Sequence, residues 1–180
     1  MGIGQTKLTL KNLKTMKKIG ILSDTHSFLH PKIFDFFKDV DEIWHAGDFG
    51  DMETADQLKN FKPLRGVYGN IDNTVVHRAF PLFNIFNIEK VKVLMTHVCG
   101  HPDHYLFHVK EVIQQEKPDI VVAGHSHILK ISHDKPNQLL FINPGAAGIT
   151  GIHQKITFVR FVIDGKTPKD MEVFETAKTA

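Results

Sequence analysis

Residues 119–127 read Asp-Ile-Val-Val-Ala-Gly-His-Ser-His. A short run of β-branched and small apolar residues is typical of a buried strand, and Gly124 indicates a tight turn at its end. Two imidazoles follow directly, at His125 and His127. Because they are two residues apart in an extended or turning segment, their side chains can reach different points of one pocket. A histidine pair alone is more often a surface feature than a metal site, so the rest of the chain must decide.

The composition is that of an ordinary globular protein. The 180 residues are 42% hydrophobic and 23% charged, which sets aside the disordered and fibrous classes. No stretch approaches the roughly 18 apolar residues of a membrane span. The net charge of +2 is too small to indicate nucleic-acid binding, and the single cysteine, Cys99, fits a reducing compartment. We therefore expect a cytoplasmic protein with neither a membrane nor a nucleic acid as a partner.

The first 15 residues differ from the rest of the chain. They carry three lysines among scattered leucines and lack the apolar block of a secretory signal. We expect residues 1–15 to be a mobile N-terminal extension and residues 16–180 to form a single domain.

The remaining pattern predicts a mixed α/β fold. In the first half, strands and helices alternate, with strands at residues 19–22, 42–45 and 64–68, and helices after Pro31 and at 52–61, the latter capped by Asp51. In the second half, one helix is predicted at 104–116. The other predicted elements are strands, at 82–88, 91–95, 119–123, 128–132, 139–142, 156–163 and 171–174. Two sheets packed face to face with helices outside would fit this order. A single doubly wound sheet is the alternative.

Five predicted strands end in side chains that bind metals. These are Asp24 with His26, Asp48, Asn70, His97, and His125 with His127. In open α/β sheets, ligands collect at the carboxyl ends of the strands, so we expect the five loops to converge. Glycine directly precedes the first donor in three of them, at Gly47, Gly69 and Gly124, and allows the backbone to turn sharply there.

The donors comprise two carboxylates, one amide oxygen and four imidazoles. Seven donors are too many for one zinc or manganese ion with an open position, and about right for two ions that share a bridging carboxylate. A set of imidazoles and oxygens without a thiolate favours manganese, iron, zinc or nickel over magnesium or calcium. The sequence therefore predicts two divalent metal ions, with manganese as the first choice.

Five sequence blocks, taken in order, resemble the signature of the calcineurin-like metallophosphoesterases. They are Asp24-Thr25-His26, Gly47-Asp48, Gly69-Asn70, Thr96-His97 and Gly124-His125-Ser126-His127. The loop Asn143-Pro144-Gly145 and the small size resemble the compact phosphodiesterase branch of bacterial and archaeal type. The resemblance runs from about Lys17 to about Phe174. It implies a four-layer α-β-β-α sandwich of two mixed sheets flanked by helices.

The resemblance also implies a role for each donor. The first metal would be held by Asp24, His26 and His127, and the second by Asn70, His97 and His125, with Asp48 bridging both. A hydroxide that bridges the two cations would hydrolyse a small phosphodiester without a covalent intermediate. The resemblance allows a homodimer.

The residues after Asn70 depart from the family pattern. In many members a histidine that helps to protonate the leaving group follows directly, whereas Ile71 and Asp72 follow here. We expect His101, Asp72 or solvent to supply that proton, so that substrates with acidic leaving groups are favoured. The candidate catalytic residues are therefore Asn70, Asp72 and His101. A second departure, Val98-Cys99, lengthens the loop before His101.

The alternative function is of another class: a non-catalytic, metal-binding scaffold of the same fold that mediates protein–protein interaction. Scaffolds of this superfamily typically have eroded ligands, whereas every ligand position is filled here. The other histidines are expected to be structural or without a role. His45 is expected to pack in the core, His104 and His108 to lie on a helix face, and His153 to have no function.

Overall fold

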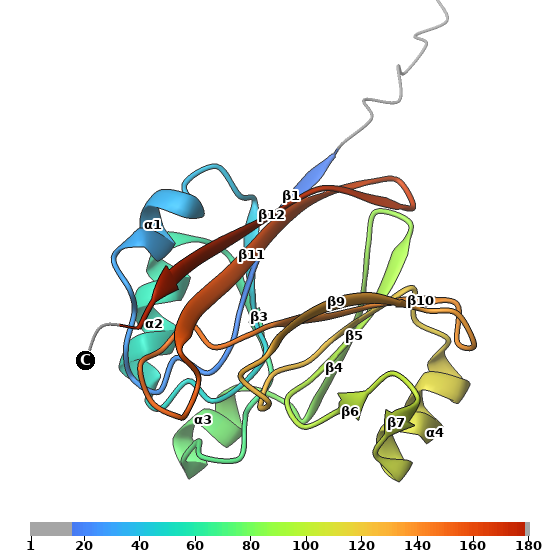
Figure 1. Ribbon diagram of the computed structural model, residues 1–180, viewed down its shortest axis with the longest axis horizontal. Helices are drawn as coiled ribbons and strands as arrows, with labels where there is room; N and C mark the ends of the chain where they lie inside the picture. The colour runs from blue at the N-terminus through green and yellow to red at the C-terminus, as the bar shows by residue number, and fades with distance from the viewer. Residues whose placement is uncertain (1–15, 179–180) are drawn as a thin grey trace, which may run out of the picture.

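The computed structural model describes residues 16–178, so the predicted extension at residues 1–15 lies outside the described part. Two five-stranded mixed sheets pack face to face (Figure 1). The first sheet has the order β12-β11-β1-β2-β3, with strands β1 (Lys17–Leu22), β2 (Glu42–His45), β3 (Leu64–Gly66), β11 (Lys155–Asp164) and β12 (Thr167–Ala177). The second has the order β4-β5-β8-β10-β9, with β4 (Phe83–Ile88), β5 (Val91–Thr96), β8 (Ile120–Val122), β9 (Leu129–Asp134) and β10 (Leu139–Pro144).

Each sheet contains three neighbouring strands that run parallel, at one side of the first sheet and in the middle of the second. In the first sheet, β1 and β2 pair in parallel, as do β2 and β3. In the second, β8 lies parallel to both β5 and β10. Parallel strands end at the same edge of a sheet, so the loops that follow these six strands are brought together by the pairing alone.

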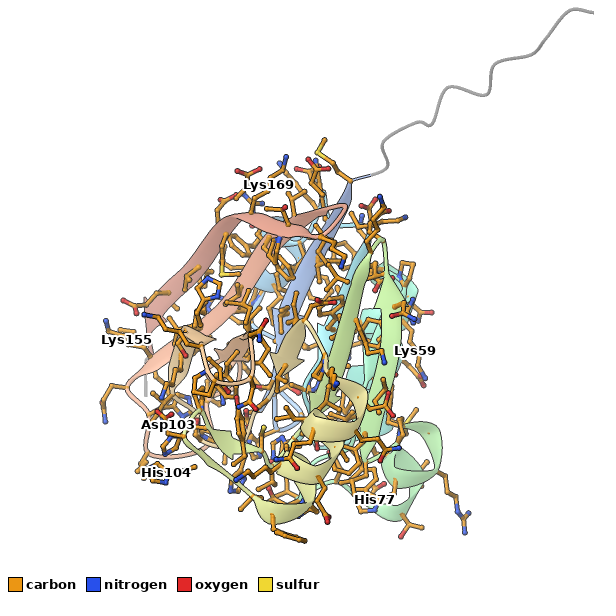
Figure 2. All side chains as sticks on the ribbon, turned by 90° about the vertical axis from the view of Figure 1, so that its right-hand side faces the viewer. Lys59, His77, Asp103, His104, Lys155 and Lys169 are labelled. Carbon is orange, nitrogen blue, oxygen red and sulfur yellow. The ribbon has the colours of Figure 1, made fainter. Side chains whose placement is uncertain are left out.

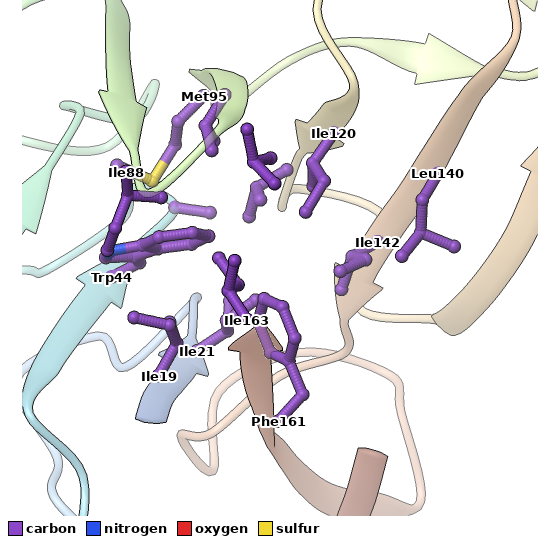
Figure 3. Packing of buried hydrophobic residues seen from close by; sticks show 14 of the residues in the cluster. Ile19, Ile21, Trp44, Ile88, Met95, Ile120, Leu140, Ile142, Phe161 and Ile163 are labelled. Carbon is purple, nitrogen blue, oxygen red and sulfur yellow. The ribbon is translucent and has the colours of Figure 1, made fainter. Parts of the chain in front are cut away.

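The space between the sheets is filled by apolar side chains from both inner faces. Ile19, Ile21 and Phe161 of the first sheet face Ile120 and Ile142 of the second (Figure 3). The Trp44 ring joins the sheets, because its centroid lies 5.2 Å from that of Phe86 in β4 and 5.9 Å from that of Phe161 in β11. This close-packed apolar layer fixes the two sheets against each other.

Helices cover both outer faces. Helices α1 (Lys32–Phe36), α2 (Met52–Phe61) and α3 (Thr74–Ala79) belong to the cluster outside the first sheet, and α4 (Phe107–Glu116) to the cluster outside the second. Ile33 and Leu58 pack in the first of these clusters, and Val109 and Ile113 in the other. The four layers α-β-β-α are thus confirmed, and the single doubly wound sheet is excluded. None of the helices within residues 16–178 has the length and apolarity needed to cross a bilayer.

Most predicted elements are found, with two differences at loops. The expected cap is present, since Asp51 Oδ1 accepts a hydrogen bond of 2.7 Å from the Thr54 N–H. The prediction of a helix from residue 104 was wrong. His104 lies in a small hairpin of β6 (Gly100–His101) and β7 (His104–Tyr105), at the edge of the molecule (Figure 2), and α4 begins only at Phe107. Helix α3 was missed, although the Asn73 side chain caps it by accepting from two backbone N–H groups.

Candidate metal centre

Backbone hydrogen bonds join the loops at the carboxyl ends of the strands. The Asp24 N–H donates to Gly47 O at 2.9 Å, and the His26 N–H to Asp48 O at 3.1 Å, which joins the loops after β1 and β2. The Gly124 N–H donates to His97 O at 3.1 Å and so joins the loops after β8 and β5. The convergence expected from the sequence is therefore present in the fold.

Five of the seven candidate ligands have a left-handed backbone. Their φ angles are +55° at Asp24, +48° at His26, +57° at Asp48, +68° at His125 and +57° at His127. Non-glycine residues rarely adopt this conformation, and each instance costs of order 1–3 kcal/mol. Strain concentrated in this way is typical of functional sites, because it is retained only where the side-chain direction matters.

The glycines before the donors are required by close packing. A Cβ on Gly69 would lie 1.9 Å from Asp48 Oδ1, and one on Gly47, where φ is +94°, would lie 2.6 Å from His97 Nδ1. A Cβ on Gly124 would lie 2.7 Å from Ala46 O. The three loops can approach one another only because these positions have no side chain.

One group of donors lies between the loops of β1 and β8. Asp24, His26 and His127 each offer a donor atom within 4.8 Å of the other two. Asp24 Oδ1 lies 3.1 Å from His127 Nε2. His26 Nε2 is buried and has no hydrogen-bond partner among residues 16–178. A buried imidazole nitrogen without a partner beside two carboxylates fits a cation, so these residues suit a metal ion.

A second group joins the two sheets. Asp24, Asp48 and His97 also have donor atoms within 4.8 Å of one another, and His97 Nε2 lies 3.0 Å from Asn70 Oδ1. Asp48 faces both groups, because its Oδ1 lies 3.3 Å from His97 Nε2 and its Oδ2 lies 3.7 Å from His26 Nε2. The carboxylate therefore has the orientation that a bridging ligand needs.

His125 contacts the centre through its backbone, and its side chain lies outside both donor groups. That side chain is exposed, although its ring centroid lies 5.3 Å from that of His97. Its backbone N–H donates to both oxygens of Asp24, at 3.2 and 3.1 Å. The loop thus fixes the Asp24 carboxylate through the main chain, while the imidazole stands at the edge of the centre.

His153, for which the sequence indicated no function, supports one of the donors. Its Nε2–H donates to Gly148 O at 3.0 Å, so a neutral ring can accept at Nδ1, which lies 3.1 Å from His127 Nδ1. This pairing leaves His127 Nε2 directed at Asp24. The two histidines are 26 residues apart, and no local spacing pattern connects them, so this contact could not be predicted from the sequence.

The two proposed proton donors lie in different surroundings. Asp72 is buried, and its Oδ1 and Oδ2 accept the N–H groups of Gly50 and Gly69 at 2.8 and 2.7 Å. Both oxygens thus brace the loop that presents Asn70, and this geometry does not support proton donation to a substrate. His101 is exposed on the hairpin and lines a pocket together with His125.

His45 packs in the core, as expected. It is fully buried and stacks on Phe49 with ring centroids 3.6 Å apart. The Gly47 N–H donates to its Nδ1 at 3.2 Å, and its Nε2 lies 2.9 Å from Thr25 Oγ1. Burial, together with the neighbouring His97, holds the pKa of His45 well below its ordinary value. The neutral ring therefore stabilises the turn before Asp48 by accepting the Gly47 N–H.

Asp48 and His97 form an ion pair in the metal-free protein. Burial raises the pKa of Asp48, but the hydrogen bond and charge of His97 outweigh it and leave that pKa below 3.8. Burial lowers the pKa of His97, but the bond to Asp48 and the charge of Asp24 leave it above 6.5. The stabilising effect of the carboxylate is present above pH 3.8 and is lost as the pH falls. That of the imidazolium is complete below pH 6.5 and is lost as the pH rises through the folded-state pKa.

A pH-dependent stability follows for the protein kept free of metal by a chelator. We expect the free energy of unfolding lost in the His97→Gln variant to be larger at pH 6 than at pH 9, because only protonated His97 pairs with Asp48. Urea unfolding at both pH values measures this difference. The exposed His133 provides a control, since His133→Gln should show no such trend. An equal loss at both pH values would mean that the ion pair does not stabilise the fold.

A four-layer sandwich with imidazoles and carboxylates at the ends of its strands defines the metallophosphoesterase class. The chain belongs to the calcineurin-like phosphoesterase superfamily, whose domain model matches residues 16–166. It is 32% identical over 134 residues to a probable metallophosphoesterase of Methanocaldococcus jannaschii, covering 71% of this chain and 67% of the relative. It is 29% identical over 153 residues to a phosphodiesterase of the same organism, covering 75% and 88% of the two chains.

A solved structure shows the same fold at lower sequence similarity. Vps29 of Chaetomium thermophilum superposes with a TM-score of 0.70 at 17% identity, covering 91% of this chain and 100% of that chain. At this identity the likeness concerns the fold alone.

Proposed function

We propose that the protein is a phosphodiesterase that hydrolyses a small phosphodiester at a centre of two divalent cations. The observation that carries this proposal is the orientation of Asp48, with Oδ1 at 3.3 Å from His97 Nε2 and Oδ2 at 3.7 Å from His26 Nε2. A carboxylate with one oxygen toward each of two donor groups is a ligand that two ions can share. Similarity to a curated phosphodiesterase supports the same conclusion.

The proposed ligands divide between the two ions. The first ion would be held by Asp24, His26 and His127, and the second by Asn70, His97 and His125, with Asp48 shared. Imidazoles and oxygens together suit manganese first, then iron, zinc or nickel. When bound, two divalent cations held by these residues would lower the pKa of water toward neutrality and so supply hydroxide at neutral pH.

The chain itself fixes the direction of these donors. The backbone N–H groups of His125 and Ile71 hold the carboxylates of Asp24 and Asp48, the latter at 3.1 Å. His97 Nδ1–H donates to Ala46 O at 2.8 Å, which leaves Nε2 toward the centre. Because the donors are held before a substrate arrives, little reorganisation is needed during the reaction. His101 or solvent would protonate the leaving group, so esters of acidic alcohols should react fastest.

A metal-binding scaffold is the second candidate, because the fold, which the chain shares with Vps29, does not by itself imply catalysis. The complete donor set and the unpaired His26 nitrogen favour the enzyme. We place either protein in the cytoplasm. There Cys99 would stay reduced, and burial, which raises the pKa of its thiol to about 12, makes it unreactive.

A metal-dependent hydrolysis assay separates the two functions. We expect turnover of bis(4-nitrophenyl) phosphate in manganese buffer and none after treatment with a chelator. Slower turnover of 4-nitrophenyl phosphate would identify the diester as the preferred class. Bound metal without turnover in manganese, iron, zinc or nickel buffer would assign the protein to the scaffold class instead.

His153 provides a further test of the first metal position. The His153→Phe variant lacks the acceptor for His127 Nδ1–H, so we expect it to bind manganese about 10–100-fold more weakly at one of the two positions. Titration calorimetry measures both affinities. The His153→Asn variant retains an acceptor oxygen and should recover part of the loss. His133→Phe, on the exposed face of β9, is the matched control. Unchanged affinity in the His153→Phe variant would show that His127 needs no support.

A further inference from the structure

A pocket of about 300 Å³ lies on the outer face of the second sheet, beside the proposed metal centre. Cys99, Gly100 and His101 from the lengthened loop line one part of it. Phe141 of β10 is 1% exposed and belongs to the cluster that α4 covers, so it forms a buried surface of the pocket. Lys130 of β9 also contributes to the lining.

The pocket is continuous with the centre through one loop. Gly124 and His125 line it, and the same glycine N–H is bonded to His97 O. The His125 ring stands 5.3 Å from that of His97. A diester with its phosphorus at the centre would therefore have room for one ester arm in the pocket.

The lining combines apolar side chains with the polar groups of His101, His125, Ser126 and Asn143, and Lys130 is its one lysine or arginine. Phe141 and Cys99 are buried, and Ile128 is 66% exposed at the margin, where an apolar ligand could cover it. The amide of Asn143 is already used, since Nδ2 donates to Gly124 O at 2.7 Å and Oδ1 accepts from Gly145 N–H at 3.0 Å. Among the described residues that line the pocket, none is acidic, and no described carboxylate forms an ion pair with Lys130.

We propose that this pocket binds one ester arm of the substrate, and that this arm is a ring-sized apolar group with a negative charge that pairs with Lys130. The inference rests on the proposed phosphodiesterase function and specifies its substrate class. It also gives the inserted residues Val98-Cys99 a function, because the loop that they lengthen forms part of the pocket. The apolar ring would cover the exposed side chain of Ile128, and its negative charge would pair with the Lys130 ammonium.

Three phosphonate monoesters test this specificity by calorimetry on the manganese-loaded protein. They are methyl methylphosphonate, methyl benzylphosphonate and methyl 4-carboxybenzylphosphonate. We expect the benzyl compound to bind about tenfold more tightly than the methyl compound, because it covers apolar surface. The carboxylate should add about threefold through Lys130, which is a solvent-accessible pairing.

Two variants locate the effect. Lys130→Ala should remove the gain from the carboxylate and leave the benzyl gain unchanged, whereas Ile128→Glu should weaken binding of both ring compounds. The matched controls Lys110→Ala on α4 and Val173→Glu on β12 should leave all three affinities as they are. The hydrolysis assay runs in parallel. Equal affinities for the three compounds in a protein that turns over diesters would overturn the pocket assignment alone. Absence of turnover would overturn the proposed function, and the substrate assignment with it.

Discussion

Replacing Asp48 by asparagine is expected to lower kcat/KM for bis(4-nitrophenyl) phosphate about 10³-fold in manganese buffer. The amide has one oxygen where the carboxylate has two, and it carries no charge. The single oxygen can therefore point toward His97 or toward His26, but it cannot be a metal ligand on both sides. Elemental analysis should show about one ion per chain in the variant, against two in the wild-type protein. Steady-state kinetics and metal content, measured on the same preparation, check both expectations.

Asp51 offers a matched control for this change. It lies three residues further along the same loop, and its side chain caps α2. Asparagine caps a helix about as well as aspartate, so Asp51→Asn should keep both metal content and activity. If the Asp48→Asn variant retained two ions and near wild-type activity, Asp48 would not be a bridging ligand. Asp24 would then be the remaining carboxylate that could bridge the ions.

The second large effect comes from a change that removes no donor. In the Gly69→Ala variant, the new Cβ would lie 1.9 Å from Asp48 Oδ1 and 2.3 Å from the Asp48 amide nitrogen, so the carboxylate must move. We expect at least about a 100-fold loss of kcat/KM, because a displacement of 1 Å at a reacting centre costs about that much. Metal content should fall below two ions per chain. Circular dichroism shows whether the variant remains folded.

Gly165, in the turn between β11 and β12, is the control for glycine replacement. Its φ is +62°, and a Cβ there would meet nothing within 4 Å. Gly165→Ala should cost about 1 kcal/mol of stability from the left-handed backbone and leave activity unchanged. A folded Gly69→Ala protein with two ions and full activity would show that the loops after β2 and β3 do not meet as described.

Much of the fold follows from local patterns. The apolar run before Gly124 predicts a buried strand, the order of strands and helices predicts a mixed α/β fold, and the cap at Asp51 places α2 correctly. These patterns leave one or two sheets open, and only the family resemblance implies two. The hairpin of β6 and β7 was not foreseen, because the apolar spacing after His104 is the same as that of the helix that begins three residues later. Helix α3 is only six residues long, which is too short for a periodic pattern to stand out.

Part of the candidate site could also be predicted from local sequence patterns. Each donor stands at the end of a strand, and pairing of parallel strands brings the ends together. The functions of Asp72 and His153 depend on partners outside their own loops, namely Gly50 and His127, and no spacing rule connects residues that meet only through the fold. The left-handed backbone of the donors also results from tertiary packing, which the residue types alone do not indicate.

Anomalous diffraction from crystals grown with manganese would locate the ions of the proposed centre. We expect two anomalous peaks about 3.5–4 Å apart. Asp48 would lie between them, with Asp24, His26 and His127 around one peak and Asn70, His97 and His125 around the other. A single peak, or two peaks of which neither contacts Asp48, would contradict the proposed centre.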